Sequence, residues 1–361
     1  MGHVNRIKVK NLTQNLILAI AATIIILVIA ELFIRLADPQ IVNYTQFDSM
    51  LMYKHVPNFE FRYFRQEFDN NIKFNSKGLR EREYAYEKEN NVYRILILGD
   101  SFTEALQVDL DSSFPKVLEE KLNSRLSNKY EVINAGIGGY GTENELLFYE
   151  FEGKKYEPNL VILAVFLNDV NDNTASPLIT FDNSKLMRHI PLKASLPKKF
   201  VLYCSRYSHI CALSQKIILE NLGDANIKHA DEIYLKNSSA EFEKSLNEIN
   251  LLLEQFRQMV DDDNDKFVVL LIPAREQVSK EFYEKYLIDN NLEEKDLFMN
   301  KFQEKIKSFG RAKNINVIDL LPRMKEISAN NSLYFEIDGH WNEKGHEFAA
   351  ELLYDYLNYR K

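Results

Sequence analysis

Residues 94–102 read R-I-L-I-L-G-D-S-F, and this stretch decides the fold class. Its apolar run, residues 95–98, ends abruptly at Gly99, as a buried parallel strand does where it leaves its sheet. Ligands of open α/β sheets bind beyond the carboxyl ends of the strands, so Ser101 lies where chemistry is expected. A plain turn is the alternative, because Gly, Asp and Ser are all turn formers. The choice depends on whether the chain also supplies a base and an oxyanion hole.

Four further segments share the pattern of a buried strand, and helical patterns separate them. The expected strands, including the first, are residues 92–98, 131–133, 160–166, 266–272 and 315–320. Apolar residues at helical spacing predict helices at residues 113–126, 241–260 and 343–358. Strand–helix alternation of this kind predicts an α/β protein built on a doubly wound parallel sheet.

An apolar segment near the N-terminus has the length and composition of a membrane span. Within residues 15–35 the one charge before the terminal arginine is Glu31, close to the end where a carboxylate reaches the lipid headgroups. About twenty such residues cross a bilayer as a helix. A cleaved signal peptide is the rival interpretation, but no clear small-x-small cleavage site follows Leu32. We therefore predict an uncleaved transmembrane anchor at residues 15–36.

Basic residues flank this span unequally, which predicts its orientation. Arg6, Lys8 and Lys10 precede the span, whereas Arg35 alone follows it closely. By the positive-inside rule, residues 1–14 form a cytoplasmic tail. The rest of this single-pass chain is then expected outside the cytoplasm.

The remaining sequence divides into a lead-in, a large domain and an irregular insertion. Short alternating pieces rich in aromatic residues predict a β-rich lead-in or stalk at residues 37–90, and the α/β domain follows at residues 91–361. Residues 171–233 are less regular and are interpreted as an insertion, with a lid as one reading of its role. The formal net charge of −8 argues against a nucleic-acid partner. The oligomeric state is left open.

Two cysteines, Cys204 and Cys211, lie seven positions apart in a stretch with a helical pattern. A disulfide is permitted outside the cytoplasm. However, seven helical residues separate two Cα atoms by roughly 10 Å, which is too far for a bridge. We therefore expect two buried thiols.

Three more predicted loops carry small or polar residues of the kinds that catalysis uses. They read N-A-G-I-G-G-Y-G-T at residues 134–142, F-L-N-D at residues 166–169 and D-G-H-W-N at residues 338–342. Each has a plain alternative when taken alone: a tight glycine turn, an Asx turn at Asn168, or a turn before a helix that Asn342 caps. Together with the loop that holds residue 101, they make a constellation.

The residue types of this constellation suit nucleophilic catalysis on an ester. A serine hydroxyl is a weak nucleophile until a neighbouring imidazole takes its proton, and His340 can do this for Ser101. Asp338 can hold the imidazole ring and stabilise its charged form. Acyl transfer also needs donors aimed at the developing oxyanion. The candidates are the backbone N–H groups of Gly139 and Ser101 and the side-chain amide of Asn168.

Other chemistries fit the sequence less well. His346 is a rival base, but it falls inside the last predicted helix. Asp338, His340 and His346 also suggest a metal site, but no further cluster of ligands completes one. The chain has no G-x-S-x-G sequence of the ordinary α/β-hydrolase kind. We therefore expect no metal.

Taken together, these blocks resemble the SGNH (GDSL-type) hydrolase superfamily. Its Ser, Gly, Asn and His blocks match, in chain order, at Ser101, Gly139, Asn168 and His340. The departures are Phe at position 102 where many members have Leu, Phe at position 166 instead of the glycine of G-x-N-D, and D-x-H in place of D-x-x-H. The last variant is similar to that of membrane-associated proteins of polysaccharide O-acetylation. The lead-in S-K-G-L-R-E-R-E from residue 76 also resembles that of anchored relatives.

The resemblance covers residues 92–361 and implies a three-layer α/β/α fold of flavodoxin-like character. It implies a serine esterase without a cofactor, whose substrate is a small-molecule or polysaccharide ester. Its location favours O-acetyl groups of carbohydrate outside the cytoplasm. Two alternatives stay open: an O-acetyltransferase that uses the same residues, and a catalytically silent module that binds glycans. In this scheme the Asp100 carboxylate braces the loop and does not react.

Overall fold

The chain forms two compact units. The computed structural model describes residues 2–126, 128–175, 177–182, 185–222 and 232–359. One unit, here called the helical unit, joins Met1–Tyr44 to Ala194–Gly223. The other, called the sheet unit, joins Thr45–Lys193 to Asp224–Lys361. Part of the irregular insertion therefore groups with the N-terminal helix, and whether any of it acts as a lid stays a prediction.

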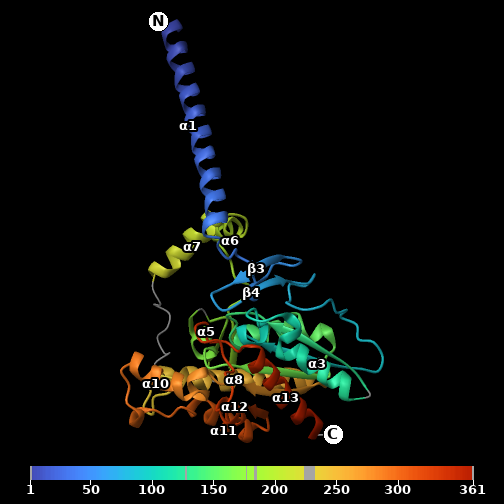
Figure 1. Cartoon of the computed structure of the whole chain (residues 1–361). Coiled ribbons are helices and arrows are strands. Elements are labelled where there is room, and N and C mark those ends of the chain that lie inside the picture. Colours follow the sequence, from blue (N-terminus) through green and yellow to red (C-terminus); the bar gives the residue numbers. More distant parts are fainter. Residues whose placement is uncertain (1, 127, 176, 183–184, 223–231, 360–361) are drawn as a thin grey trace. The chain divides into compact units, whose positions relative to one another are not determined.

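The helical unit contains one long apolar helix and a helical hairpin (Figure 1). Helix α1 spans Gly2–Ala37, α6 spans Leu196–Tyr207 and α7 spans His209–Leu222. Within α1, the 26 residues Leu12–Ala37 have a mean hydropathy of 2.9 over their most apolar window, and none of that window is buried. The predicted anchor, residues 15–36, lies inside this segment, which is long and apolar enough to cross a membrane.

The expectation of two buried thiols is wrong, because Cys204 and Cys211 form a disulfide. Their Cα atoms are 5.7 Å apart and both residues are partly exposed. The estimate of about 10 Å assumed one continuous helix. The chain instead leaves α6 at Tyr207 and enters α7 at His209, so it turns back at Ser208 and brings the two cysteines together.

The sheet unit is built on a five-stranded parallel sheet, which confirms the predicted fold class. Every strand expected from the sequence is present, and the second is longer than predicted. The strands are β5 (Val92–Gly99), β6 (Lys129–Gly136), β7 (Leu160–Val165), β10 (Lys266–Leu271) and β11 (Asn316–Asp319). Their order in the sheet is β11-β10-β7-β5-β6, and all neighbours are parallel. This is the 2-1-3-4-5 order of flavodoxin-like folds.

Helices cover both faces of this sheet and short hairpins surround it. The helices of the sheet unit are α2 (Ser101–Glu104), α3 (Phe114–Arg125), α4 (Thr142–Phe151), α5 (Asp169–Ala175), α8 (Ala240–Asp262), α9 (Arg275–Val278), α10 (Lys280–Asp289), α11 (Lys301–Lys313), α12 (Leu321–Ser328) and α13 (Glu343–Tyr359). Short 3-10 turns lie at Leu110–Ser112, Gly153–Tyr156 and Glu294–Asp296. The remaining strands are β1 (Thr45–Asp48), β2 (Met52–His55), β3 (Glu60–Phe64), β4 (Asp69–Lys73), β8 (Ile179–Asp182) and β9 (Lys185–Arg188).

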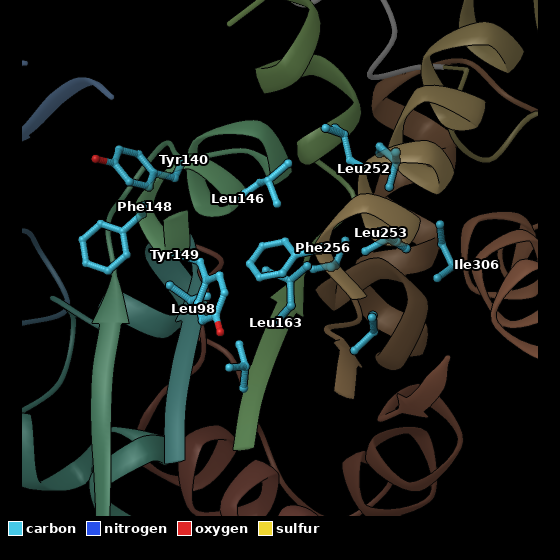
Figure 2. Close-up of a cluster of buried hydrophobic side chains, with 14 of the residues drawn as sticks. Leu98, Tyr140, Leu146, Phe148, Tyr149, Leu163, Leu252, Leu253, Phe256 and Ile306 are labelled. Carbon is cyan, nitrogen blue, oxygen red and sulfur yellow. The ribbon is translucent and has the colours of Figure 1, made fainter. Parts of the chain in front are cut away.

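The core has two halves because successive strand residues point to opposite faces. On one face, Leu98 and Leu163 pack with residues of α4, α8 and α11, and Figure 2 shows them facing Phe256 of α8. On the other face, Ile95 and Ile97 pack with residues of α3, α12 and α13. A central strand that is buried on both faces reads as an unbroken apolar run, which is why the pattern at residues 95–98 was informative.

Residues 45–90 of the predicted lead-in belong to the sheet unit and contain two short hairpins, whereas residues 37–44 group with the helical unit. Strands β1 and β2 pair antiparallel, and so do β3 and β4. The S-K-G-L-R-E stretch beyond them is largely buried. The guanidinium of Arg80 donates to the backbone oxygens of Glu104, Ala105 and Val108, and Glu81 binds Lys116 at 2.9 Å. This part of the chain therefore packs against the loop that follows β5.

We predict that Gly136→Ala destabilises the sheet unit by about 1–3 kcal/mol, because added bulk in a packed core forces the backbone to shift. A Cβ at this position would lie 2.3 Å from the backbone nitrogen of Glu104. Gly153→Ala is the matched control, since its new Cβ would meet side chains, Leu96 at 3.0 Å and Tyr149 at 3.3 Å, and would stay 3.6 Å from the nearest backbone atom among its contacts. Urea unfolding measures both variants, and an equal loss of stability in the two would contradict the prediction.

Candidate active site

Four loops meet at the carboxyl edge of the sheet. Strand β5 lies between β6 and β7. The chain leaves β5 toward β6 on one side, and it leaves β7 toward β10 on the other side. This switch point is where α/β sheets bind ligands. Ser101 follows β5, Gly139 follows β6 and Asn168 follows β7. The fourth loop runs between Tyr334 and Trp341, which pair across an antiparallel bridge.

Three of the predicted site residues form a hydrogen-bonded chain. The Oγ atom of Ser101 lies 2.8 Å from Nε2 of His340, although 239 positions separate them in sequence. Nδ1 of the same imidazole lies 2.6 Å from Oδ1 of Asp338. Because a carboxylate only accepts, Nδ1 carries the ring proton and Nε2 is free to accept from the serine hydroxyl. This is the arrangement of nucleophile, base and orienting carboxylate that activates a serine.

The side chains of His340 and Asp338 are only partly exposed, and the Asp338 carboxylate is held in its charged form. The side chain of His340 is 25% exposed and that of Asp338 is 16% exposed. Burial alone would raise the pKa of Asp338, but hydrogen bonds and charge attraction from His340 outweigh it and lower that pKa. Asp338 therefore stays ionised across the neutral range, where it stabilises an imidazolium.

The start of helix α2 fixes the serine. Asp100 is fully buried and caps the helix, since its Oδ1 accepts the backbone N–H of Phe102 at 2.9 Å. Burial raises the pKa of the Asp100 carboxyl to about 6. Strand β5 can approach this turn only because residue 99 is glycine: a Cβ there would lie 2.1 Å from Oγ1 of Thr103. Asp100 thus braces the loop, as expected.

The loop after β6 presents Gly139 with a φ of +77°, a conformation that favours glycine. A Cβ on Gly139 would also lie 2.7 Å from the Tyr53 hydroxyl, which donates to the backbone oxygen of Gly138 at 2.9 Å. Gly138 is the residue of this loop next to the nucleophile, because a Cβ on it would lie 3.7 Å from that of Ser101. Its own N–H already donates to Glu104, so the neighbouring N–H of Gly139 stays a candidate oxyanion donor.

Asn168 is anchored by an acidic neighbour. One N–H of its side-chain amide donates to Oδ2 of Asp172 at 2.8 Å. The amide also interacts with Asp100, because a side-chain hydrogen bond from Asn168 lowers the pKa of that carboxyl against the effect of burial. As an N–H donor at this edge of the sheet, Asn168 stays a candidate for the oxyanion hole. Burial, and then the charge of Asp100, raises the pKa of Asp172 to about 7. The pKa values of Asp169 and Glu145 are also raised, first by burial and then by neighbouring carboxylates.

These carboxyls do not form a metal site. In the part of the chain that the structure describes, no three His, Cys, Asp or Glu side chains are arranged to hold a metal ion. His346, the rival base, lies apart from the hydrogen-bonded chain. It is 1% exposed and stacks on Phe114, whose N–H it accepts at 3.4 Å. Burial lowers the pKa of the His346 imidazole to about 3, so it stays neutral in the folded protein.

Comparison with known proteins shows the family of the chain. The sequence model of the GDSL-like lipase/acylhydrolase family matches residues 97–348, which is more than half of the chain. The chain belongs to this family. It is therefore an SGNH-type esterase, a serine ester hydrolase of the kind the sequence blocks resemble. No curated protein matches the chain.

Solved structures are similar at a greater distance. The acetyl xylan esterase AlAXEase is 16% identical; the match covers 73% of this chain and 99% of that one, with a TM-score of 0.44. A lipase/acylhydrolase from Enterococcus faecalis is 15% identical, with coverages of 74% and 96% and a TM-score of 0.42.

Two departures from the GDSL-type pattern compensate for each other. The Phe102 ring packs on the Phe166 ring with their centroids 4.5 Å apart, so the two unusual residues fill one space. Phe102 also lies 4.8 Å from the His340 ring and 5.2 Å from the Trp341 ring. An apolar wall therefore supports one side of the imidazole, which limits the orientations it can take.

The sequence analysis missed Glu67, a residue that holds the loop of this esterase from outside. Glu67 lies in the turn between β3 and β4. Its carboxylate accepts three consecutive backbone N–H groups, those of Glu336, Ile337 and Asp338, at 2.7, 3.0 and 2.8 Å. Beside it, Phe68 packs against Phe335 with centroids 5.4 Å apart. Nothing in the sequence marks a glutamate in a polar turn as different from its neighbours.

A second missed contact links the lead-in to the glycine loop. Glu104, one turn after the nucleophile, places one oxygen 2.9 Å from Nε2 of His55 and accepts the N–H of Gly138 at 2.9 Å with the other. Both side chains are 1% exposed. The ring of His55 also lies 3.0 Å from the backbone oxygen of Gly78. The lead-in therefore fixes both halves of the site, the glycine loop and the histidine loop.

We predict that Glu67→Gln lowers kcat by about 10-fold with little change in KM, because it removes charge-assisted hydrogen bonds that hold the Asp338 loop. Asp69→Asn is the control, since Asp69 pairs with exposed Arg62 on the same hairpin and not with the histidine loop in the part of the chain that the structure describes. Steady-state kinetics on an acetyl ester, with thermal unfolding alongside, measures the effect. A rise in KM alone, or equal losses in the two variants, would show that Glu67 does not position the catalytic loop.

We predict that His346→Gln reduces the loss of folding free energy that occurs when the pH falls from 7.5 to 5. Below pH 6.5 the unfolded state binds a proton at position 346, whereas the folded state does not until about pH 3, so the parent protein loses stability as the pH falls. At pH 5 this loss is about 2 kcal/mol. Urea unfolding of parent and variant at pH 7.5 and pH 5 isolates the difference. Parallel pH dependences would contradict it.

Proposed function

We propose that this protein is a membrane-anchored serine esterase that removes O-acetyl groups from carbohydrate outside the cytoplasm. The observation that carries the proposal is the continuous hydrogen-bonded chain from Ser101 through His340 to Asp338. A module that only bound glycans would have no need of this alignment, so the geometry favours catalysis over a silent binding role.

In the proposed reaction, Oγ of Ser101 attacks the ester carbonyl while Nε2 of His340 takes its proton. The tetrahedral intermediate then expels the sugar hydroxyl, which receives that proton from the imidazolium. Water repeats the sequence on the acyl-enzyme and releases acetate. Asp338 stays ionised throughout and stabilises the charged imidazole. No cofactor enters these steps.

The negative charge of the intermediate falls on the former carbonyl oxygen. We assign its donors to the backbone N–H groups of Ser101 and Gly139 and to the side-chain amide of Asn168. Each donor of this kind is worth on the order of a hundredfold to a thousandfold in rate. The contacts of Tyr53 in the lead-in and of Glu104 in α2 support this role, because they hold the glycine loop against the nucleophile.

The substrate class rests on sequence resemblance and on location. The D-G-H-W block at residues 338–341 is similar to that of membrane-associated proteins that act in polysaccharide O-acetylation. The apolar helix α1, with basic residues mainly before it, supports a single-pass anchor with residues 1–14 in the cytoplasm. The disulfide supports the same topology, because disulfides persist in oxidising compartments.

We predict that the full-length protein, in detergent, hydrolyses a chromogenic acetyl ester, and that Ser101→Ala lowers kcat by roughly 10³-fold or more because it removes the nucleophile. Ser124→Ala, an exposed serine at the end of α3, is the control. A fluorophosphonate that labels the parent and not the Ser101 variant identifies the nucleophile. Equal rates in parent and Ser101→Ala would instead favour the silent glycan-binding module.

The same preparation distinguishes hydrolysis from transfer. Both reactions share the acyl-enzyme and differ in whether water or a sugar hydroxyl captures it. With an acetylated oligosaccharide as donor and an unacetylated one as acceptor, an esterase yields free acetate. Acetylated acceptor as the main product, formed without matching acetate release, would make the protein an O-acetyltransferase.

A further inference from the structure

The hairpin of α6 and α7 is fastened to the last turns of α1 within the helical unit. Glu31 of α1 accepts hydrogen bonds from the Ser208 hydroxyl and from the backbone N–H groups of His209 and Ile210, at 2.8, 2.9 and 3.0 Å. Arg35 donates to the backbone oxygen of Tyr207 at 2.6 Å. The turn between α6 and α7 is therefore held at the level of residues 31–35 of α1.

This level corresponds to the edge of a bilayer. The apolar segment Leu12–Ala37 has 26 residues, which at 1.5 Å per residue is about 39 Å long. The hydrocarbon core of a bilayer is only about 30 Å thick, or about 20 helical residues. If the apolar segment begins at the inner boundary, Glu31 lies where the hydrocarbon ends. The hairpin bound to Glu31 then lies in the interfacial layer.

Helix α6 carries an unpartnered apolar stripe. Leu196, Phe200, Tyr203 and Tyr207 are 81%, 67%, 61% and 55% exposed. Their spacing of four, three and four residues places them on one side of the helix. A water-facing helix surface normally carries polar residues in these positions. Large apolar and tyrosine side chains with a polar tip are instead typical of the membrane interface.

Two further features fit a lipid surface. Lys199 is exposed at the border of the stripe, and Lys198 is exposed on the opposite side of the helix, so a basic group is available where the stripe meets anionic headgroups. Apolar exposure also continues onto α7, where Ile217, Ile218 and Leu219 are 48%, 58% and 61% exposed. Figure 1 shows the hairpin at the end of α1, where the contacts of Glu31 hold the turn between α6 and α7.

We propose that α6 lies in the phospholipid interface on the side where α1 leaves the membrane, with the stripe of residues 196, 200, 203 and 207 facing the acyl chains. The occupant of this surface is lipid, not a protein partner. The inference rests on the proposed anchor and does not depend on the esterase chemistry. It gives the disulfide a role, since the link between Cys204 and Cys211 keeps the two helices of the hairpin in one geometry.

Quenching of tryptophan by brominated lipid tests this placement. The chain has one tryptophan, Trp341, which is fully buried and gives a constant background. We expect Phe200→Trp in full-length protein, reconstituted in anionic phosphatidylcholine–phosphatidylglycerol vesicles, to add blue-shifted emission that is largely lost when the phosphatidylcholine is brominated. Tyr203→Trp, on the same stripe, repeats the measurement independently.

Phe298→Trp is the matched control, because Phe298 is an exposed phenylalanine of the sheet unit. Red-shifted, unquenched emission from both stripe variants would show that the stripe faces water and would overturn the proposal. Blue-shifted emission without quenching would mean that a protein surface covers it, which also overturns the proposal. Equal quenching of Phe298→Trp would show that the quenching is not specific to α6, and this result would also overturn the proposal.

Failure of the anchor is recognised separately. Alkaline carbonate extracts the protein from vesicles if α1 does not span, and the inference about α6 then fails with the anchor. Ester hydrolysis by the same protein in detergent does not change with either result, so the esterase proposal is judged independently.

Discussion

A serine and a histidine that lie 239 positions apart must meet within hydrogen-bonding distance, and the architecture of the sheet unit is the way this chain achieves it. Parallel strands deliver all their outgoing loops to one edge, and the reversal of strand order around β5 leaves a crevice there. The loops themselves are held by polar contacts from residues 45–83, of which those of Glu67 lie near the surface and those of His55 are buried. Glu67 fixes the histidine loop, and Glu104 with His55 fixes the glycine loop.

Much of this arrangement was predictable because it depends on local pattern. The run of apolar residues before Gly99 predicts a strand buried on both faces, and a loop at its end follows from the topology. The positions of Ser101 and His340 followed from residue chemistry together with chain order. The phenylalanine at position 166, where the family pattern has glycine, is explained by a contact seen in the structure, because its ring packs on the ring of Phe102.

What the sequence did not reveal depends on contacts between distant segments. The helix around the two cysteines ends at Tyr207 because Glu31, more than 170 positions earlier, caps the next helix at His209. A calculation that treats the stretch as one helix therefore places Cys204 and Cys211 too far apart. The assignment of a neutral, structural role to His346 likewise required its burial against Phe114, which no spacing rule reports.

The route of the backbone between the two units has a consequence for release from the proposed membrane anchor. The polypeptide passes from one unit to the other three times, after Tyr44, after Lys193 and after Gly223. A protease that cut only the first of these connections would leave the enzyme retained, because residues 194–223 remain bonded to α1 through Glu31 and Arg35. Under the proposed anchor, one cut after Tyr44 therefore leaves the enzyme bound until these non-covalent contacts break, whereas an anchor joined by a single tether would be lost at one cut.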